Sequence, residues 1–225
     1  MPSFDIVKTI DASQSFRVKK IQADFDLNAS QIQEHFKGEI ITPDDWQIGV
    51  IVGGSGTGKS TIAKHLFKDN IITQFEYKSQ SVIDDMPKGV SVDEISKMFY
   101  AVGFGSVTSW LKPYNVLSNG EKMRVDLARA LLQKDFVCFD EFTSVVDRQV
   151  AQTSCIAINK AIKRTKKQFV AISCHYDILE WLQPDWVFDT NKMQGFFGMS
   201  HASKNDMKSE NVSVASGKNL SVIII

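Results

Sequence analysis

Residues 48–60 (IGVIVGGSGTGKS) constrain the fold of this chain more than any other stretch. A short apolar run, typical of a buried strand, leads into a glycine-rich loop. Gly53, Gly58, Lys59 and Ser60 have the spacing of the Walker A phosphate loop. Alone, such a loop is also typical of a flexible turn. Apolar residues at helical spacing follow it, namely Ile62, Ala63, Leu66 and Phe67. The stretch therefore predicts a strand, a phosphate-binding loop and a helix.

The residue types of this loop match the chemistry of a nucleoside triphosphate. Glycines let the backbone turn tightly, so that its N–H groups reach phosphate oxygens without an intervening Cβ. Lys59 is expected to reach the β- and γ-phosphates, and the Ser60 hydroxyl to take one coordination position of Mg²⁺. We therefore expect ATP and Mg²⁺ to bind here. The expected contact residues are Gly53, Gly54, Ser55, Gly56, Thr57, Gly58, Lys59, Ser60 and Thr61.

Two acidic residues follow a second apolar run. Residues 136–139 (FVCF) predict a strand, and Asp140 and Glu141 come directly after it. Ligands of open α/β sheets bind at the carboxyl ends of the strands, so both carboxylates are expected near the phosphates. Asp140 is predicted to share Mg²⁺ with Ser60, and Glu141 to polarise the attacking water. The alternative is a pair of solvated loop acids.

Three further residues are candidates for contact with the nucleotide. His175 lies at the tip of the predicted strand over residues 169–173, from which it can reach the γ-phosphate. Phe16 and Phe25, before the phosphate loop, are candidates for stacking on adenine. A phenylalanine on a strand more often belongs to a core, so both alternatives stay open.

Composition and charge narrow the range of partners. Lys plus Arg and Asp plus Glu both number 26 in the 225 residues, so no net charge draws the chain to nucleic acid. The basic run over residues 160–167 lacks interleaved aromatic residues and is interpreted as the solvated end of a helix. Cys138, Cys155 and Cys174 have the spacing of neither a metal site nor a disulfide framework and are expected to be reduced core residues. No leader-like N-terminus and no apolar run near ~20 residues are found, so we predict a cytoplasmic protein without a transmembrane segment.

The order of the segments predicts an α/β fold with a P-loop NTPase core. We expect a mostly parallel sheet, an N-terminal antiparallel β portion and a short helical insertion. The ATP-binding domain is expected over residues 1–190, with the insertion at about 81–130. The finer expectations are strands with a turn over residues 16–27, a helical turn over 30–36 capped by Ser30, a strand over 71–77 and a helix over 93–100.

The character of the chain changes after Asp189. Residues 191–225 are rich in Ser, Asn, Lys and Gly with little periodicity, which predicts a poorly ordered tail. Residues 222–225 (VIII) are too short to span a membrane and could dock on a sheet edge or on a partner.

A third strong signal begins at Leu117 with LSNGEKMRVDLARALL. A polar turn containing glycine precedes a helix with an apolar residue at every fourth position. Ser118 is well placed as the N-cap of this helix, and Glu121 follows three residues later, as in a capping box. A local capping role is therefore an alternative to any binding role of these two residues.

Together and in this order, the Walker A loop, LSNGE before the ARALL helix, FVCFDE, SVVD and the strand-end histidine resemble the ATP-binding-cassette (ABC) ATPases. The resemblance covers about residues 47–189. It implies that two such domains pack head to tail, so that each ATP lies between the Walker A loop of one and the signature turn (residues 117–121) of the other.

The resemblance also implies roles for single residues. Ser118 and Gly120 would bind the γ-phosphate of the ATP held by the opposite subunit. Asp147 would lie at the dimer seam, and His175 would contact the γ-phosphate. Gln80 is the candidate for the Q-loop residue, which would add a third metal ligand to Ser60 and Asp140. Lys59, Glu141 and His175 would then be the catalytic residues.

The chain departs from the family pattern in several places. Asn119 stands where a second glycine is usual and Glu121 where glutamine is common, which is expected to weaken or retune contact across the dimer. Phe142 replaces the proline common after the Walker B glutamate. Only 58 positions separate Lys59 from Leu117, fewer than transporter subunits generally use for the helical subdomain that docks on membrane domains.

These departures, with DEFTSVVDR, SCHYDILEWL and QPDWVFD, resemble a soluble branch of ABC ATPases associated with an acetyltransferase-like domain. The chain ends soon after these motifs, so a stand-alone or truncated form is expected, and nothing in it supplies acetyltransferase chemistry. We predict an ATPase that acts as a head-to-tail dimer and couples ATP turnover to an effector protein or domain. The alternatives are the ATP-binding subunit of a membrane transporter and a nucleotide-dependent switch or scaffold with negligible hydrolysis.

Overall fold

A computed structural model describes residues 2–11, 13, 15–26, 31–72, 75–198 and 223–224 of the chain. Its centre is a five-stranded sheet in the order β4-β5-β3-β6-β7. The strands are β3 (Ile48–Val52), β4 (Phe136–Phe139), β5 (Gln168–Ser173), β6 (Trp186–Asp189) and β7 (Gln194–Phe197). The first four run parallel and β7 runs antiparallel to β6. The predicted mostly parallel sheet is thus confirmed, and the carboxyl ends of four strands meet at one edge.

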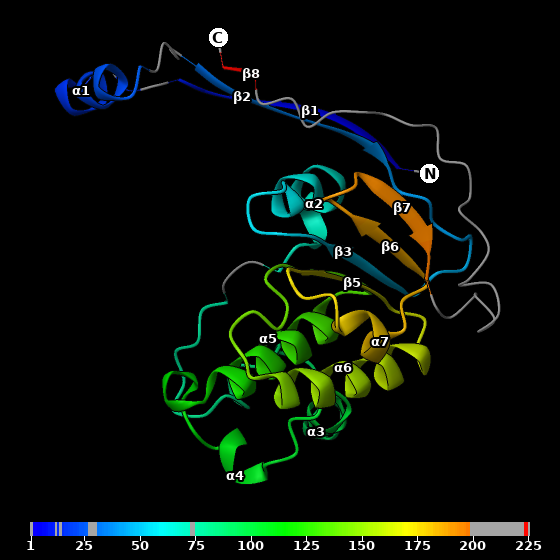
Figure 1. Cartoon of the computed structure of the whole chain (residues 1–225). Helices are drawn as coiled ribbons and strands as arrows, with labels where there is room; N and C mark the ends of the chain where they lie inside the picture. The colour runs from blue at the N-terminus through cyan, green and yellow to red at the C-terminus, as the bar shows by residue number, and fades with distance from the viewer. Residues whose placement is uncertain are drawn as a thin grey trace.

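Both faces of this sheet are buried, because side chains alternate between two hydrophobic clusters. Val50 of β3 and Ala171 of β5 belong to one cluster, and Ile51 and Ile172 belong to the other. An N-terminal β-hairpin, described below, and helix α2 cover the face that contains Ile51 and Ile172. Helices α5, α6 and α7 cover the face that contains Val50 and Ala171 (Figure 1). The helices are α2 (Lys59–Phe67), α5 (Asn119–Gln133), α6 (Arg148–Lys163) and α7 (Ile178–Leu182).

The N-terminal part is an antiparallel hairpin, as predicted. It pairs β1 (Ser3–Asp11) with β2 (Gln31–Glu39), and β8 (Ile223–Ile224) lies along the other edge of β2. The C-terminal strand therefore docks on a sheet edge, one of the two options the sequence left open. Near the central sheet, Phe4 and Phe36 are buried, and the Phe4 ring packs edge-on against Phe188 at 5.5 Å.

The helical insertion lies between the phosphate-loop helix and β4. Over the predicted bounds of about 81–130 it contains α3 (Val92–Ala101), α4 (Val107–Trp110), a short 3-10 turn at Tyr114–Val116 and the first part of α5. Another 3-10 turn, Lys68–Asn70, directly follows α2. A capping box between Ser91 and Glu94 begins α3, and Ile95 and Phe99 form its buried face. The helix predicted over residues 93–100 is confirmed.

Four of the finer predictions are wrong. Residues 16–24 form helix α1 (Phe16–Asp24), because the Ser15 hydroxyl accepts the Val18 N–H as an N-cap. Residues 31–36 belong to β2, since pairing with β1 satisfies their backbone groups. In the segment 71–77, the described residues 71–72 and 75–77 form no strand, and Ile71 makes an isolated bridge to Cys138. Residues 194–197, assigned to the tail, form β7 because β6 offers a free edge. Ser30 and residues 199–222 lie outside the described residues.

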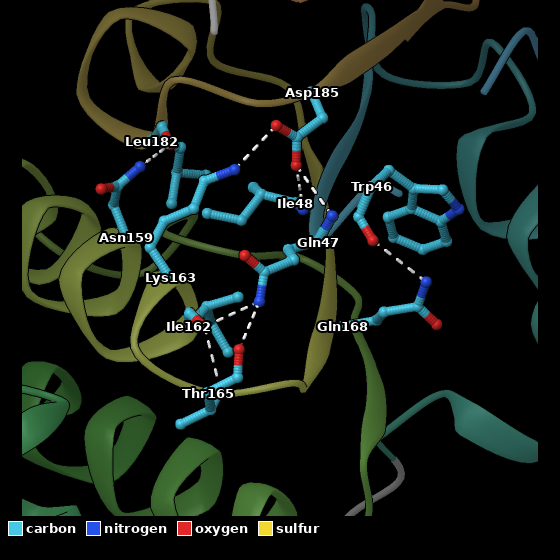
Figure 2. Close-up of polar contacts among 10 residues, drawn as sticks. All are labelled: Trp46, Gln47, Ile48, Asn159, Ile162, Lys163, Thr165, Gln168, Leu182 and Asp185. Atoms are coloured by element: carbon cyan, nitrogen blue, oxygen red, sulfur yellow. Dashed lines mark hydrogen bonds and ion pairs between the residues drawn. The ribbon is translucent and has the colours of Figure 1, made fainter. Parts of the chain in front are cut away.

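A polar cluster holds the amino end of β3 against α6 (Figure 2). Asp185, only 2% exposed, accepts the backbone N–H groups of Gln47 and Ile48, both at 2.8 Å. Its other oxygen pairs with Lys163 Nζ at 2.7 Å. The Gln47 amide donates to the Ile162 and Thr165 carbonyls at 3.1 and 2.5 Å, which ties the start of β3 to the C-terminal end of α6 and the turn after it. This cluster fixes the strand that enters the phosphate loop.

Two of the three cysteines are core residues, as predicted. Cys138 and Cys155 are buried, and burial raises the pKa of both thiols, that of Cys155 to about 12. Cys174 is partly exposed. None of the helices in the described ranges combines the length and the apolar character needed to cross a bilayer.

Candidate nucleotide-binding site

The phosphate loop joins β3 to α2 and contains two glycines, Gly53 and Gly58, at which a Cβ would clash with neighbouring side chains. Gly58 has φ +87°, and a Cβ there would lie 2.4 Å from a ring carbon of Phe36. A Cβ on Gly53 would lie 2.1 Å from Thr190 Oγ1. Gly58 is also the N-cap residue of α2 and provides no side-chain cap. The N-terminal N–H groups of this helix are therefore open to an anion.

Lys59 carries a buried charge with a weak partner. Lys59 is only 8% exposed, and its Nζ donates to the Gly54 carbonyl at 2.6 Å. No carboxylate of the described residues forms an ion pair with it. Buried charges are usually paired, because leaving water costs several kcal/mol per ion. The ammonium thus contacts the backbone of the loop to which a phosphate group could bind.

Ser60 and Asp140, which the sequence analysis expects to share Mg²⁺, lie in contact although they belong to different elements. Ser60, in the first turn of α2, donates its hydroxyl to Asp140 Oδ1 at 3.0 Å. The same oxygen accepts the Glu141 N–H at 2.9 Å. Mg²⁺ prefers hard oxygen ligands and binds through one or two protein groups plus phosphate oxygens. A hydroxyl and a carboxylate in contact beside the loop fit that ion.

Glu141 is held in an unusual backbone conformation. Its φ is +54° and that of Thr143 is +64°, and between them Phe142 is fully buried and donates its N–H to the Ile172 carbonyl at 2.8 Å. Left-handed conformations of non-glycine residues cost about 1–3 kcal/mol each and concentrate at functional sites. The exposed Glu141 carboxylate accepts the Ser144 hydroxyl at 2.6 Å. Phe142, which departs from the family pattern, therefore anchors this turn.

His175 follows β5 at the same edge of the sheet. It is half-buried, and its backbone N–H donates to Ser173 Oγ at 3.1 Å. Its imidazole forms no hydrogen bond with the other described residues. The ring is thus free to bind a ligand, which is compatible with its predicted role.

The tip of β6 was missed by the sequence analysis, yet it contacts the loop directly. The hydroxyls of Thr190 and Thr57 lie 2.5 Å apart, and the Gly54 N–H donates to Asn191 Oδ1 at 3.1 Å. The signal was available, because Asp189, Thr190 and Asn191 follow an apolar strand just as Asp140 follows β4.

The residues assigned to the opposite subunit are engaged within their own chain. Ser118 and Glu121 form the predicted capping box, with hydrogen bonds of 2.9 and 3.3 Å between backbone N–H groups and side chains. A Cβ on Gly120 would lie 2.8 Å from Val150 Cγ1 of α6. Asp147 is exposed and caps α6 by accepting the Val150 N–H at 2.9 Å. Each residue thus has a local reason for its identity.

The remaining candidates lie away from these groups. Gln80 is exposed and lines a cavity of about 440 Å³ that also contains Tyr77 and Tyr114. It forms no hydrogen bond with Ser60, Asp140 or any other described residue. Phe16 begins α1 and Phe25 directly follows it. This helix lies at the far end of the hairpin, and the two residues are 81% and 69% exposed (Figure 1). Phe36 is the aromatic ring that the structure places on the phosphate loop.

The cavity beside Gln80 contains a second polar arrangement. Tyr77 and Tyr114 are stacked with ring centroids 3.9 Å apart, and each donates its hydroxyl to one oxygen of Asp126 at 2.7 Å. Burial raises the pKa of Asp126, while the two tyrosine hydrogen bonds lower it, and the net pKa is raised. Burial and the nearby carboxylate raise the pKa of both tyrosines.

Comparison with known proteins finds relatives of one kind. An uncharacterized ABC transporter ATP-binding protein of Haemophilus influenzae is 30% identical over 150 residues, covering 54% of this chain and 61% of that protein. The inner membrane ABC transporter ATP-binding protein YddA of Escherichia coli is 28% identical over 135 residues, covering 49% of this chain and 24% of that protein. The chain thus spans less than two thirds of the length of either relative.

The fold has matches among solved structures. The dimeric structure of MJ0796, a bacterial ABC transporter cassette, superposes with a TM-score of 0.57 at 14% identity and covers 83% of this chain and 92% of that chain. No protein-family model matches the sequence.

Proposed function

We propose that this chain, an ABC-type ATPase cassette by its fold and by its sequence relatives, binds ATP with Mg²⁺ and hydrolyses it between two copies packed head to tail. The observation that carries the proposal is the contact between Ser60 and Asp140 at 3.0 Å, beside a glycine loop that buries Lys59. A phosphate loop, a pair of Mg²⁺ ligands and a carboxylate for water meet at one edge of the sheet.

Lys59 supplies the first step. In the structure its ammonium donates to the Gly54 carbonyl within the loop. Phosphate oxygens are stronger acceptors than a carbonyl, so the ammonium would move to the β- and γ-phosphates when ATP binds. The backbone N–H groups at the start of α2 would bind the same anion.

Ser60 and Asp140 would hold Mg²⁺, which neutralises charge on the phosphates when bound. The hydrogen bond between them, at 3.0 Å, brings the two oxygens next to each other, which supports this assignment. Gln80 forms no contact with either, so we do not assign it to the metal.

Glu141 would position and deprotonate the attacking water. Its backbone is left-handed, and its exposed carboxylate accepts the Ser144 hydroxyl. The carboxylate would leave Ser144 to reach water near the γ-phosphate. His175, with a free imidazole at the adjacent strand end, would contact the same phosphate.

The second copy would contribute Ser118, Gly120 and Asp147. The dimeric structure of the MJ0796 cassette, whose fold this chain shares, supports this arrangement. Ser118 lies at the exposed N-terminus of α5, and its hydroxyl donates to Glu121 Oε2 at 3.1 Å. It could turn this proton to a partner's phosphate while it still accepts the Glu121 N–H. Cytoplasmic location is part of this proposal.

The experiment is ATP hydrolysis by the purified chain as a function of protein concentration, with Glu141→Gln as the test variant. The rate per chain should rise with concentration, because the site is completed by a second copy. Loss of a general base typically costs about 10²- to 10⁴-fold, so the variant should be nearly inactive and should elute as a dimer with ATP. Glu180→Gln, on the exposed side of α7, is the matched control and should keep full activity.

Full activity of Glu141→Gln would contradict the assignment of the base. ATP binding without phosphate release at any concentration would instead favour a switch or scaffold. A second candidate function, the ATP-binding subunit of a transporter, is favoured by the names of both sequence relatives. Co-purification with an integral membrane protein would support it, and the short insertion argues against it.

A further inference from the structure

We propose that Tyr176, Asp189 and Asn191 are positioning residues that link the loop carrying His175 to the phosphate loop, and that this link favours ATP over ADP. The inference rests on the proposed function, because it assumes that His175 contacts the γ-phosphate. It concerns residues to which neither the motifs nor the proposed mechanism assigns a role.

At the phosphate loop, the link ends on the peptide groups of Gly54. The Gly54 N–H donates to Asn191 Oδ1, and the Gly54 carbonyl accepts Lys59 Nζ and Thr57 Oγ1, at 2.6 and 2.9 Å. When phosphate draws Lys59 away, this carbonyl loses one of its two donors. The bond to Asn191 then remains to hold the loop in place.

At the other end, the link reaches the residue directly after His175. The Asn191 side-chain N–H group donates to Tyr176 Oη at 2.9 Å, and the Tyr176 hydroxyl donates to Asp189 Oδ1 at 3.0 Å. The Asn191 backbone N–H donates to the same Asp189 oxygen at 2.9 Å. Asp189 is 3% exposed and ends β6, so the three hydrogen bonds close on a rigid strand.

The two ends of the link lie beside groups that would contact different phosphates of the nucleotide. The phosphate loop would bind the β-phosphate of ATP and of ADP alike, whereas His175 would touch only the γ-phosphate. A hydroxyl anchor one residue after His175 limits where the imidazole can lie. Its loss should therefore weaken binding of the triphosphate more than binding of the diphosphate.

A purely structural role predicts another outcome. Thr190 already braces the loop, since its N–H and hydroxyl contact the Val52 carbonyl at 2.8 and 3.2 Å and it is fully buried. Tyr176 is 44% exposed, and its hydroxyl can be solvated when a partner is lost. Removal of that hydroxyl should thus leave the fold intact, and any effect on both nucleotides alike would point to structure.

The experiment measures the Kd values of the Mg²⁺ complexes of a non-hydrolysable ATP analogue and of ADP for Tyr176→Phe, which keeps the direct bond between Asn191 and the Gly54 N–H. We expect the affinity for the analogue to fall about 2- to 10-fold, the range of one net hydrogen bond, and the affinity for ADP to change less than about 2-fold. The melting temperature should be unchanged for Tyr176→Phe. Tyr100→Phe, which removes an exposed hydroxyl on α3 without a described partner, is the matched control.

A double-mutant cycle with His175→Ala separates positioning from other roles. If Tyr176 acts through His175, Tyr176→Phe should have no further effect on analogue binding in the His175→Ala background. Equal losses for both nucleotides, no loss for either, or full additivity with His175→Ala would overturn the inference while the proposed function stands. A wild-type chain that binds neither nucleotide would overturn the proposed function and the inference with it.

Discussion

The two regions that the proposed sandwich would bring together differ in how their polar groups are used. At the sheet edge, Lys59 is buried beside a carbonyl, Ser60 contacts Asp140 across elements, and the His175 imidazole forms no hydrogen bond with the part of the chain that the structure describes. On the other side, Ser118 of the signature turn already caps α5 of its own chain, and Asp147 already caps α6. Contacts within the chain thus do not fully explain the polar groups at the sheet edge, as expected for the proposed binding site. The signature turn needs experiments that separate its local role from its proposed role toward a partner.

The largest effect is expected at Lys59. Lys59→Met keeps the length of the side chain and removes the charge, so nucleotide affinity should fall about 10- to 100-fold through the loss of charge-assisted hydrogen bonds. Stability without nucleotide should be kept or raised, because an apolar group replaces a buried, weakly paired ammonium. Titration calorimetry gives the affinity, and urea unfolding gives the stability.

Lys64→Met is the control for Lys59→Met, since Lys64 lies on the same helix and is exposed. It should leave both quantities unchanged. If Lys59→Met bound ATP like the wild type, or if it unfolded the chain, Lys59 would have a structural role and the contrast between the two regions would disappear.

A smaller effect is expected at Ser118, where two substitutions separate capping from phosphate binding. Ser118→Asp keeps an N-cap side chain, so the free energy of unfolding should change by less than about 0.5 kcal/mol, whereas Ser118→Ala should cost about 1 kcal/mol. A carboxylate facing a partner's γ-phosphate would repel it, so Ser118→Asp should reduce ATP hydrolysis at least about 10-fold.

Ser91 provides the matched control, because it caps α3 with the same capping-box geometry toward Glu94. Ser91→Asp and Ser91→Ala should repeat the stability changes without loss of hydrolysis per folded chain. Wild-type hydrolysis by Ser118→Asp would mean that Ser118 only caps α5 and that no partner phosphate reaches it.

Much of the sheet edge could be predicted because its elements are specified locally. The strands β3, β4 and β5 are continuous apolar runs that end in polar residues, as strands buried on both faces must be. The Walker A glycines and the capping box at Ser118 combine residue type with spacing, and the structure shows the strained or capped geometry that each requires.

The rest depended on pairing between distant segments, which local sequence does not reveal. Gly38 and Phe36 belong to β2 only because β1 lies alongside, and β7 exists because β6 offers an edge. Asn191 was assigned to the tail, since a polar residue after a short strand has many local explanations. Its contact with Gly54 becomes visible only when β6 is placed beside β3.

The smallest effect concerns Asp126, on the same helix as Ser118 but outside both halves of the proposed site. Burial raises its pKa above the ordinary aspartate value, against the hydrogen bonds from Tyr77 and Tyr114. The unfolded state therefore ionises first as the pH rises. Stability that Asp126 contributes at low pH should be lost between about pH 4 and its raised folded-state pKa.

Asp126→Asn keeps the shape of the side chain and removes this titration. The difference in free energy of unfolding between the variant and the wild type should shift in favour of the variant as the pH rises from about 4 to 7. Urea unfolding at several pH values, followed by tryptophan fluorescence, measures it. A shift in favour of the wild type would mean that hydrogen bonds from the two tyrosines to the carboxylate outweigh burial. ATP hydrolysis should stay at the wild-type rate in either case, because the polar network of α5 that includes Asp126 does not contact the sheet edge.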